Sequence, residues 1–432
     1  MYNAVDLYEH NLNSYQKIRQ AYDDGEKIVG IVHATGTGKS YNALQLAYDE
    51  KDKKIVYVVP SVGIIDHIKK IIMNNPNLDL ERDFSNLEFR TYQSFVSLSR
   101  EQIKNIDCDL LILDEFHHMG APIWGNRINM LVDTHSNMKV FGMTAYTVRD
   151  RGTEYERDMA NEEDDELFSN KIVSKYDLCD AMIDKILPKP IYRSAYINLE
   201  EELSELEQRI DRLSANRQVE LKKLLKDAVK RVHEAPGIAD VLKKNIKPNG
   251  KYIYFCPPNS VDGVNDIETI KKQAMEWFKT FVPEKDIVFY TSTKEMGEEG
   301  KENRDNFYND MSMTGEDTGD KLRVMFAINQ YNEGIHAPNI DGVIMGRGTT
   351  SDIIFFEQLG RALSVRGNTK DEYKKLKNKS REELVLLCKE RDILIRKELS
   401  KDEIIETLLA PVVIDLAGNY DFIKELENNL KE

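Results

Sequence analysis

The octapeptide HATGTGKS (residues 33–40) follows a β-rich run, EKIVGIV (26–32), and precedes a helix-like segment, YNALQLAYDE (41–50). A strand, a glycine-rich turn and a helix in this order form the setting in which backbone N–H groups bind phosphate. The octapeptide fits the frame G-x-x-x-x-G-K-[ST], except that His33 stands in place of the first glycine. We name residues 33–40 the phosphate loop and expect it to bind a nucleotide.

Each position of the phosphate loop has a chemical reason. Gly36 and Gly38 allow the tight turn that points successive N–H groups at phosphate oxygens. Lys39 can reach the β and γ phosphates, and Ser40 can hold Mg²⁺ at the start of a helix. The predicted nucleotide-binding residues of the loop are Thr35, Gly36, Thr37, Gly38, Lys39 and Ser40.

Short apolar runs separated by polar helical segments predict parallel sheets that helices cover on both faces. After the run at 26–32, the first series lies at residues 54–60, 87–92, 109–114 and 139–143. A second series lies at residues 251–255, 286–290, 322–328, 342–345 and 412–416. The sequence therefore predicts an α/β fold with two doubly wound parallel-sheet domains.

Two adjacent carboxylates end the apolar run LLILDEFHH (110–118), and Asp114 follows Lys39 by 75 residues (114 − 39). A carboxylate at the end of a buried strand beside a phosphate loop is well placed to hold Mg²⁺. A neighbouring carboxylate can orient and deprotonate an attacking water. We therefore expect Asp114 and Ser40 to be the metal residues and Glu115 to be the catalytic base.

Length and composition restrict the class of protein. The 432 residues suffice for two or three domains, and 41% hydrophobic with 31% charged residues is a globular composition. The apolar runs are far shorter than the roughly 18 residues of a membrane span, so we expect no membrane partner. The four cysteines, at least 71 residues apart (179 − 108), predict a reducing cytoplasm. The net charge of −15 does not exclude a nucleic-acid partner, because charge acts over about 10 Å at 0.1 M salt.

Four motifs in order, HATGTGKS, DEFH (114–117), MTAYT (143–147) and FFEQLGRALS (355–364), resemble those of superfamily 2 helicases and translocases. The similarity is to the DEAD/DEAH-type branch that contains restriction-enzyme motor subunits. It implies two RecA-like domains that close on ATP and Mg²⁺, with nucleic acid lying across both. It also implies a bacterial protein, or one of a phage or mobile element acting in bacterial cytoplasm.

The resemblance assigns further residues of the first half. Tyr15 and Gln16 resemble the adenine-recognising motif upstream of the phosphate loop. Ser61 in VVPS and Thr91 in RTYQS resemble residues that contact the nucleic-acid backbone, although ordinary turns remain an alternative for both segments.

Two further residues of the first half resemble coupling positions. His117 corresponds to the fourth residue of the DEAH box, which senses the domain interface. Thr144 resembles the residue that links the state of ATP to interdomain contact. We therefore expect His117 and Thr144 to couple hydrolysis to movement.

In the second half, Gly334 in NEGIHAPNIDGVIM (332–345) resembles a nucleotide-contacting position. Arg361 matches the arginine finger. The predicted catalytic residues are therefore Arg361, Lys39 and Glu115. The chain departs from the family at two places in this motif. Glu357 stands where Gln or His is usual, and Ser364 stands where a second Arg is common. Together with His33, these departures keep open a protein that uses ATP only to switch conformation.

A basic segment follows the arginine motif. Residues 366–381 carry seven basic and two acidic side chains, a balance of +5. They lead into two helices with predicted capping boxes, Ser380 with Glu383 and Ser400 with Glu403. Residues 376–410 resemble SAP or helix-extended-loop-helix modules, which commonly bind DNA; a solvated charged surface is the alternative. The predicted nucleic-acid contacts of this insertion are Lys374, Lys375, Lys377 and Lys379.

The domain organisation follows from these segments. We expect a first RecA-like domain at residues 1–185 and a second at 186–369, with an insertion at 370–410 and the last strand and helix of the second domain at 411–432. A leucine seam predicts a helical hairpin at about 199–233, and ILPKP (186–190) is the expected hinge.

The sequence thus predicts an ATP-driven helicase or translocase on DNA, preferably duplex and otherwise single-stranded. A protein partner in replication, repair or defence fits the same resemblance. Two alternatives stay open. One is an RNA helicase, and the other is a nucleotide-gated DNA-binding protein that recruits a partner without motor activity.

Overall fold

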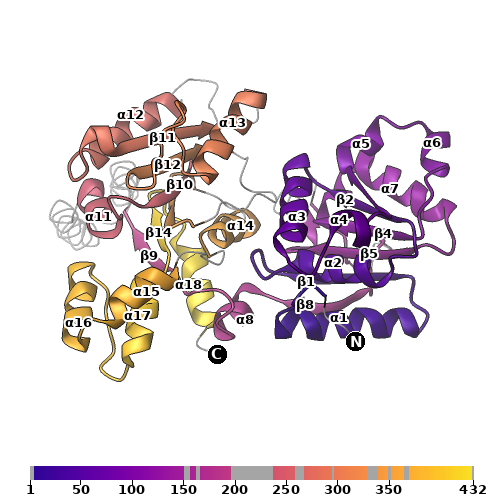
Figure 1. Ribbon diagram of the computed structural model, residues 1–432, viewed down its shortest axis with the longest axis horizontal. Helices are drawn as coiled ribbons and strands as arrows, with labels where there is room; N and C mark the ends of the chain where they lie inside the picture. Colours follow the sequence, from indigo (N-terminus) through magenta and orange to yellow (C-terminus); the bar gives the residue numbers. More distant parts are fainter. Residues whose placement is uncertain are drawn as a thin grey trace, which may run out of the picture. The chain divides into compact units, whose positions relative to one another are not determined.

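The computed structural model describes residues 4–149, 156–161, 166–195, 237–257, 267–293, 296–328, 339–348, 352–363 and 369–430. These residues form two compact units (Figure 1). The first unit contains the described residues up to Leu187 together with helix α14 (Asp352–Leu363), and the second contains the rest. The chain first passes from one unit to the other between Leu187 and Pro188, inside the ILPKP segment.

The first unit is built on a six-stranded sheet in which every paired strand is parallel. Its strand order is β3 (Leu87–Thr91), β2 (Ile55–Val59), β4 (Leu110–Asp114), β5 (Lys139–Thr144), β1 (Ile28–His33) and β8 (Ile172–Tyr176). The helices are α1 (Glu9–Asp23), α2 (Lys39–Asp49), α3 (Val62–Asn74), α4 (Leu80–Asp83), α5 (Tyr92–Val96), α6 (Arg100–Lys104), α7 (Pro122–Thr134), α8 (Leu178–Ile183) and the 3₁₀ turn η1 (Phe116–Gly120). β6 (Val148–Arg149) pairs antiparallel with β7 (Arg157–Asp158).

Helices cover both faces of this sheet, as the apolar runs predicted. Alternate residues of β2 point to opposite faces. Tyr57 packs in a cluster with α1, α2 and α3, whereas Val56 packs in a cluster with α5, α6 and α7. All five residues of β2 and of β4 are buried, which explains why these strands lack polar alternation.

The second unit has its own six-stranded sheet, and all its pairings are parallel as well. Its order is β11 (Ile287–Ser292), β12 (Leu322–Ala327), β10 (Lys251–Phe255), β13 (Gly342–Met345), β14 (Val412–Asp415) and β9 (Ile191–Ser194). Its helices are α11 (Ile238–Asn245), α12 (Ile267–Phe278), α13 (Gly297–Tyr308), α15 (Thr369–Lys377), α16 (Arg381–Glu390), α17 (Lys401–Leu409), α18 (Tyr420–Asn429) and the turn η2 (Glu284–Asp286). The predicted α/β class with two doubly wound sheets is confirmed.

Helices α15 to α17 lie between β13 and β14 along the chain, and they share an apolar core with the second sheet. Leu384 and Cys388 of α16 and Ile405 of α17 belong to the same buried cluster as Ile344 of β13 and Ile414 of β14. Both predicted capping boxes are formed, at Ser380 with Glu383 and at Ser400 with Glu403. The three helices are therefore packed onto this sheet rather than attached by a tether.

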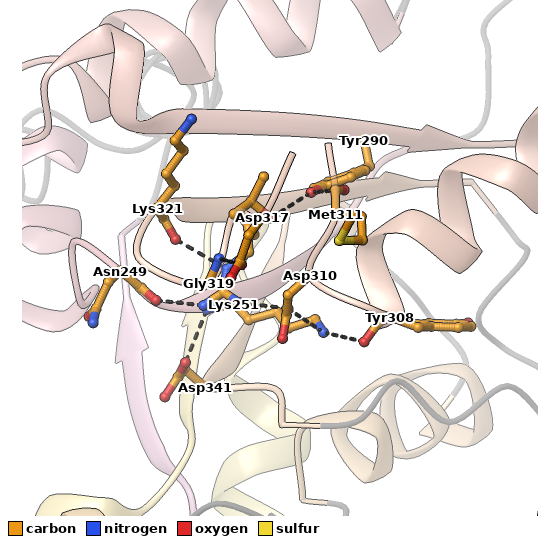
Figure 2. Close-up of polar contacts among 12 residues, drawn as sticks. Asn249, Lys251, Tyr290, Tyr308, Asp310, Met311, Asp317, Gly319, Lys321 and Asp341 are labelled. Atoms are coloured by element: carbon orange, nitrogen blue, oxygen red, sulfur yellow. Dashed lines mark hydrogen bonds and ion pairs between the residues drawn. The ribbon is translucent and has the colours of Figure 1, made fainter. Parts of the chain in front are cut away.

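A buried ionic cluster fixes the loop that precedes β12 (Figure 2). The ammonium of Lys251, only 1% exposed, lies 2.9 Å from an Asp310 carboxylate oxygen and donates to the Tyr308 carbonyl at 3.2 Å. Arg323 binds the same Asp310 oxygen at 2.6 Å. Asp310 has a left-handed backbone, with φ of 57°, so the loop is held in a strained turn by two buried cations.

Some expected features lie outside the described residues, namely the helical hairpin at about 199–233 and the segment that contains Gly334. The helices in the described ranges are too short or too polar to span a membrane.

Candidate active site

The predicted site residues of the first unit gather at one edge of its sheet. Because parallel strands end at the same edge, Thr91, Asp114, Thr144 and His33 all come to that edge from β3, β4, β5 and β1. β5 separates β4 from β1, so Thr144 lies between the strand of the carboxylates and the strand of the phosphate loop. This strand order places the Thr144 hydroxyl between the two carboxylates and the phosphate loop.

The phosphate loop has the backbone that its glycines predict. Gly36 and Gly38 both have φ of 87°, in the left-handed region that side chains avoid. Gly38 is also the N-cap of α2, and a Cβ at this position would lie 2.9 Å from the Asn11 amide nitrogen. The loop therefore presents the start of a helix at a turn that requires glycine.

Lys39 and Glu115 lie close together at the centre of the site. The Lys39 ammonium is 3.6 Å from a Glu115 carboxylate oxygen, and the two side chains are 8% and 14% exposed. Asp114 is buried beside them at the end of β4. Burial, and then the charge of Glu115, raise the pKa of Asp114, whereas Lys39 lowers it. A bound cation would relieve this unfavourable carboxylate pair.

The backbone and the side chain of Glu115 are both constrained. Its φ of 49° is left-handed, which is costly for a residue with a side chain and is typical of functional sites. One carboxylate oxygen accepts hydrogen bonds from the Ala145 N–H at 3.2 Å and the Thr144 hydroxyl at 3.1 Å. The end of β5 thus orients the candidate base.

The structure also brings His117 and Thr144 together. His117 Nδ1 and the Thr144 hydroxyl oxygen are 2.8 Å apart, and the same nitrogen lies 3.6 Å from Glu115. Burial lowers the pKa of His117 to about 3, so the ring is neutral near pH 7. The Thr144 hydroxyl thus contacts both Glu115 and His117, and the coupling role of His117 and Thr144 stays a prediction.

His33, the residue that departs from the glycine pattern, has a packing explanation. Its buried ring places Nε2 within 3.0 Å of the Ser14 hydroxyl and 3.1 Å of the Ser174 hydroxyl. Burial, followed by the charge of Lys39, lowers the pKa of His33 to about 3. The neutral histidine therefore joins α1, β1 and β8 behind the phosphate loop.

The prediction that Tyr15 contacts the nucleotide is wrong. Its ring is 1% exposed within the core of the first unit, and its hydroxyl donates to the Asp49 carboxylate at 2.5 Å. Tyr15 therefore packs α1 against α2, because it lies on the apolar stripe of α1 with Ile18 and Tyr22. Gln16 is exposed on the same helix, and its contact with adenine stays a prediction.

Sequence reasoning missed His10 and Asn11, which both bond the carbonyl of Thr37 in the phosphate loop. The buried face of α1 carries a detectable signal. It is apolar at Ile18 and Tyr22 but polar toward its first turn, at His10 and Asn11. A helix face that changes from apolar to polar toward one end indicates a polar neighbour at that end.

Ser61 and Thr91, the residues predicted to contact the nucleic-acid backbone, are both helix N-caps. Ser61 precedes α3, and its hydroxyl is buried without a hydrogen-bond partner. Thr91 precedes α5 and accepts from the Ser94 N–H at 3.2 Å. Helix N-termini bind phosphate, so this geometry suits the predicted role without testing it.

Helix α14, which carries Arg361, belongs to the same compact unit as the phosphate loop. A Cβ at Gly360 would lie 3.0 Å from the Thr35 Cβ, so α14 approaches the phosphate loop at a glycine. The side chains of Arg361 and Glu357 lie outside the described residues, as do Ser364 and Gly334. Their predicted roles stay predictions.

The lysines of the insertion differ in their surroundings. Lys374 and Lys375 are exposed on α15, and Lys379 is partly exposed beyond its end. Lys377 is paired with Asp402 of α17 at 2.9 Å. The charge of Lys377 is therefore already compensated in part by a carboxylate.

Comparison with known proteins gives a family for the first unit. Residues 4–149 match the family model of the type III restriction enzyme, res subunit. No curated protein matches the chain significantly.

Three similar solved structures cover both sheets. The first is a fragment described as an HsdR subunit of a type I restriction enzyme from Vibrio vulnificus YJ016, with a TM-score of 0.54 and 17% identity over 96% of this chain and 65% of that one. The second is the type ISP restriction-modification enzyme LlaBIII bound to DNA, with a TM-score of 0.50 and 14% identity over 99% and 32%. The third is the DUF1998 helicase MrfA bound to DNA, with a TM-score of 0.50 and 14% identity over 99% and 48%.

The chain spans less than two thirds of the length of each of these proteins. At such low identity the likeness shows the fold, which is that of two RecA-like domains. The family match and the fold agree with the superfamily 2 resemblance that the motifs predicted. Residues 4–149 carry a domain of the restriction-enzyme res-subunit type, and the chain as a whole has the fold of two RecA-like domains.

Proposed function

We propose that the protein is a motor that couples ATP hydrolysis to movement along DNA, with duplex DNA as the preferred track. The observation that carries this proposal is the arrangement at the edge of the first sheet. A phosphate loop with two left-handed glycines lies beside Lys39, and Lys39 lies 3.6 Å from Glu115. This arrangement suits phosphoryl transfer from a nucleotide to water.

The residues present fit ATP with Mg²⁺. The N–H groups of the phosphate loop and the Lys39 ammonium would bind the phosphates, and Ser40 with Asp114 would hold the metal. Bound Mg²⁺ supplies positive charge that offsets the charge developing on the phosphate oxygens. Burial, and then the charge of Glu115, raise the pKa of Asp114, and a cation bound there would offset both effects, which supports the metal assignment.

Glu115 acts as the base that orients and deprotonates the attacking water. Its hydrogen bonds to Thr144 and Ala145 hold the carboxylate in place. In this proposal Arg361 is the arginine finger and Gly334 contacts the nucleotide, as the superfamily implies. Gln16 recognises the adenine base. His117 and Thr144 pass the state of the site to the rest of the protein.

DNA is the preferred track for two reasons. LlaBIII and MrfA, two of the similar structures, are bound to DNA. The chain also offers a basic helix in its insertion, where Lys374 and Lys375 are exposed. Ser61 and Thr91 would contact the backbone phosphates of the track. The likeness to restriction enzymes further supports defence as the process, with a partner subunit.

The test is an ATPase assay with no nucleic acid, single-stranded DNA, duplex DNA and RNA, on the wild type and on Lys39→Ala. We expect duplex DNA to stimulate turnover most and Lys39→Ala to abolish it. Triplex displacement on duplex DNA then reports movement. Stimulation by RNA alone would select the RNA helicase. Binding of ATP and DNA without displacement would select the recruitment protein.

A further inference from the structure

One carbonyl of the phosphate loop accepts two hydrogen bonds from α1. His10 Nε2 and Asn11 Nδ2 each lie 2.8 Å from the Thr37 carbonyl oxygen. Both donors are buried, Asn11 with 1% of its surface exposed. One hydrogen bond is enough to satisfy a buried carbonyl, and this one accepts two from neutral donors. The contact therefore also fixes the direction in which the Thr37 carbonyl points.

That consequence follows from the flat peptide between Thr37 and Gly38. In a trans peptide the C=O of one residue and the N–H of the next point in opposite directions. Since the Thr37 carbonyl faces α1, the Gly38 N–H faces away from α1. If this peptide turned over, an oxygen would replace the N–H and would repel a phosphate.

Both donors are themselves held in position. The His10 ring stacks on Tyr176 with centroids 4.4 Å apart and planes at 11°. The Asn11 carbonyl oxygen accepts from the Asn42 amide at 3.3 Å, which fixes the Asn11 amide with its nitrogen toward Thr37. The donors therefore cannot follow the peptide if it rotates.

We propose that His10 and Asn11 are positioning residues that lock the Thr37–Gly38 peptide so that the Gly38 N–H faces the phosphates of the nucleotide. The proposal rests on the proposed binding of ATP by the phosphate loop. Neither residue contacts the nucleotide itself. These two hydrogen bonds order the phosphate loop when the protein folds, so that ATP binding does not carry the free-energy cost of ordering it.

The kinetic consequence is specific. An N–H that contacts a phosphate equally well before and during hydrolysis contributes to binding and not to the chemical step. Loss of either donor should therefore raise the KM and the dissociation constant for ATP and leave kcat nearly unchanged. Each lost hydrogen bond should cost about fivefold in affinity, and the double variant about 25-fold.

The experiment uses the full chain with His10→Phe, Asn11→Ala and the double variant. His10→Phe keeps a ring against Tyr176 and removes only the donor. His10→Gln restores a donor and should recover most of the affinity. Tyr22→Phe is the matched control, because Tyr22 is buried on the same helix and its hydroxyl donates to the Val140 carbonyl rather than to the phosphate loop.

Binding of a fluorescent ATP analogue, steady-state ATPase and thermal unfolding without nucleotide are measured for every variant. The proposal requires weaker binding in both donor variants, recovery in His10→Gln and near wild-type binding in Tyr22→Phe. It is overturned if the donor variants bind as the wild type does, or if Tyr22→Phe weakens binding equally. If the wild type itself binds no ATP, the proposed function fails instead.

Discussion

Glu115 concentrates the strain and the charge of the candidate site in one residue. Its backbone is left-handed, and its carboxylate accepts hydrogen bonds from the end of β5 and lies near Lys39. We predict that Glu115→Gln lowers kcat at least about 100-fold, because a general base contributes roughly 10² to 10⁴ in rate. ATP binding should persist, since the phosphate loop is intact.

The measurement is steady-state ATPase together with binding of the ATP analogue. Glu101→Gln on α6 is the control, and it should leave both quantities unchanged. Full turnover in Glu115→Gln would assign the base to another residue.

His33 and His117 make the stability of the first unit depend on pH. Burial lowers the pKa of each to about 3, below the ordinary value of 6.5. The unfolded chain therefore binds more protons below pH 6.5, and the folded state loses stability as the pH falls. Each histidine should lower the free energy of unfolding by about 1.4 kcal/mol between pH 7.5 and 5.5.

Urea unfolding at both pH values, followed by Trp124 fluorescence in a Trp277→Phe background, measures this loss. His33→Gln should make the fall smaller by about 1.4 kcal/mol. His135→Gln, at a partly exposed histidine, serves as the control. An equal fall in His33→Gln and the wild type would show that His33 is protonated in the folded state.

At the residue scale, the sequence pattern predicts those functional residues that lie within one short motif. The phosphate loop and the pair Asp114 and Glu115 carry their chemistry in adjacent letters of the sequence. The contacts of His10 and Asn11 with Thr37 join residues 27 and 26 positions apart, so only the folded chain reveals them. The predicted nucleotide contact of Tyr15 was wrong because the resemblance of a short motif does not show which face of a helix is buried.

The basic helix α15 allows a graded prediction at the scale of one element. Lys374→Gln with Lys375→Gln should weaken DNA binding and reduce the slope of log affinity against log salt by about 1.8, because each phosphate contact contributes about 0.9. Lys377→Gln should change the slope less, since Lys377 is paired with Asp402.

Fluorescence anisotropy with labelled duplex DNA at several salt concentrations measures these slopes. Lys51→Gln with Lys53→Gln is the matched control, because both lysines precede β2 at the sheet edge opposite Ser61 and Thr91. An unchanged slope in the Lys374 and Lys375 variant would remove α15 from the proposed DNA contact.

Every central strand of the two sheets coincides with an expected apolar run, whereas two of the four edge strands, β8 and β9, do not. The runs at β2 and β4 are apolar throughout because neighbours and helices bury them completely. β8 and β9 lie at sheet edges, are only partly buried and carry polar residues, so no apolar run marks them. An apolar run in the sequence indicates a buried strand, and an edge strand can form although it is less buried.

Across the whole molecule, the two units should unfold as separate transitions. Each unit holds one of the two tryptophans, Trp124 in the first and Trp277 in the second. We predict that Asp310→Asn lowers the stability of the second unit by about 3 kcal/mol, because it removes the carboxylate that pairs with buried Lys251 and Arg323. Asparagine tolerates the left-handed backbone of position 310.

Single-tryptophan variants report each unit in denaturant unfolding. The Trp277 transition should shift in Asp310→Asn, whereas the Trp124 transition should not. Glu268→Gln breaks an exposed pair with Lys271 and should cost less than about 1 kcal/mol. A parallel shift of both transitions would show that the units unfold together.

Strand β9 pairs with β14, although 223 positions separate Tyr192 from its hydrogen-bond partner Asp415. During synthesis at roughly 5 to 20 residues per second, β9 must therefore wait on the order of 10 to 45 s for its neighbour to leave the ribosome. Until then an unpaired edge is exposed to other nascent chains. The cell must shield that edge, and we expect the yield of this protein to depend on chaperones at the exit tunnel.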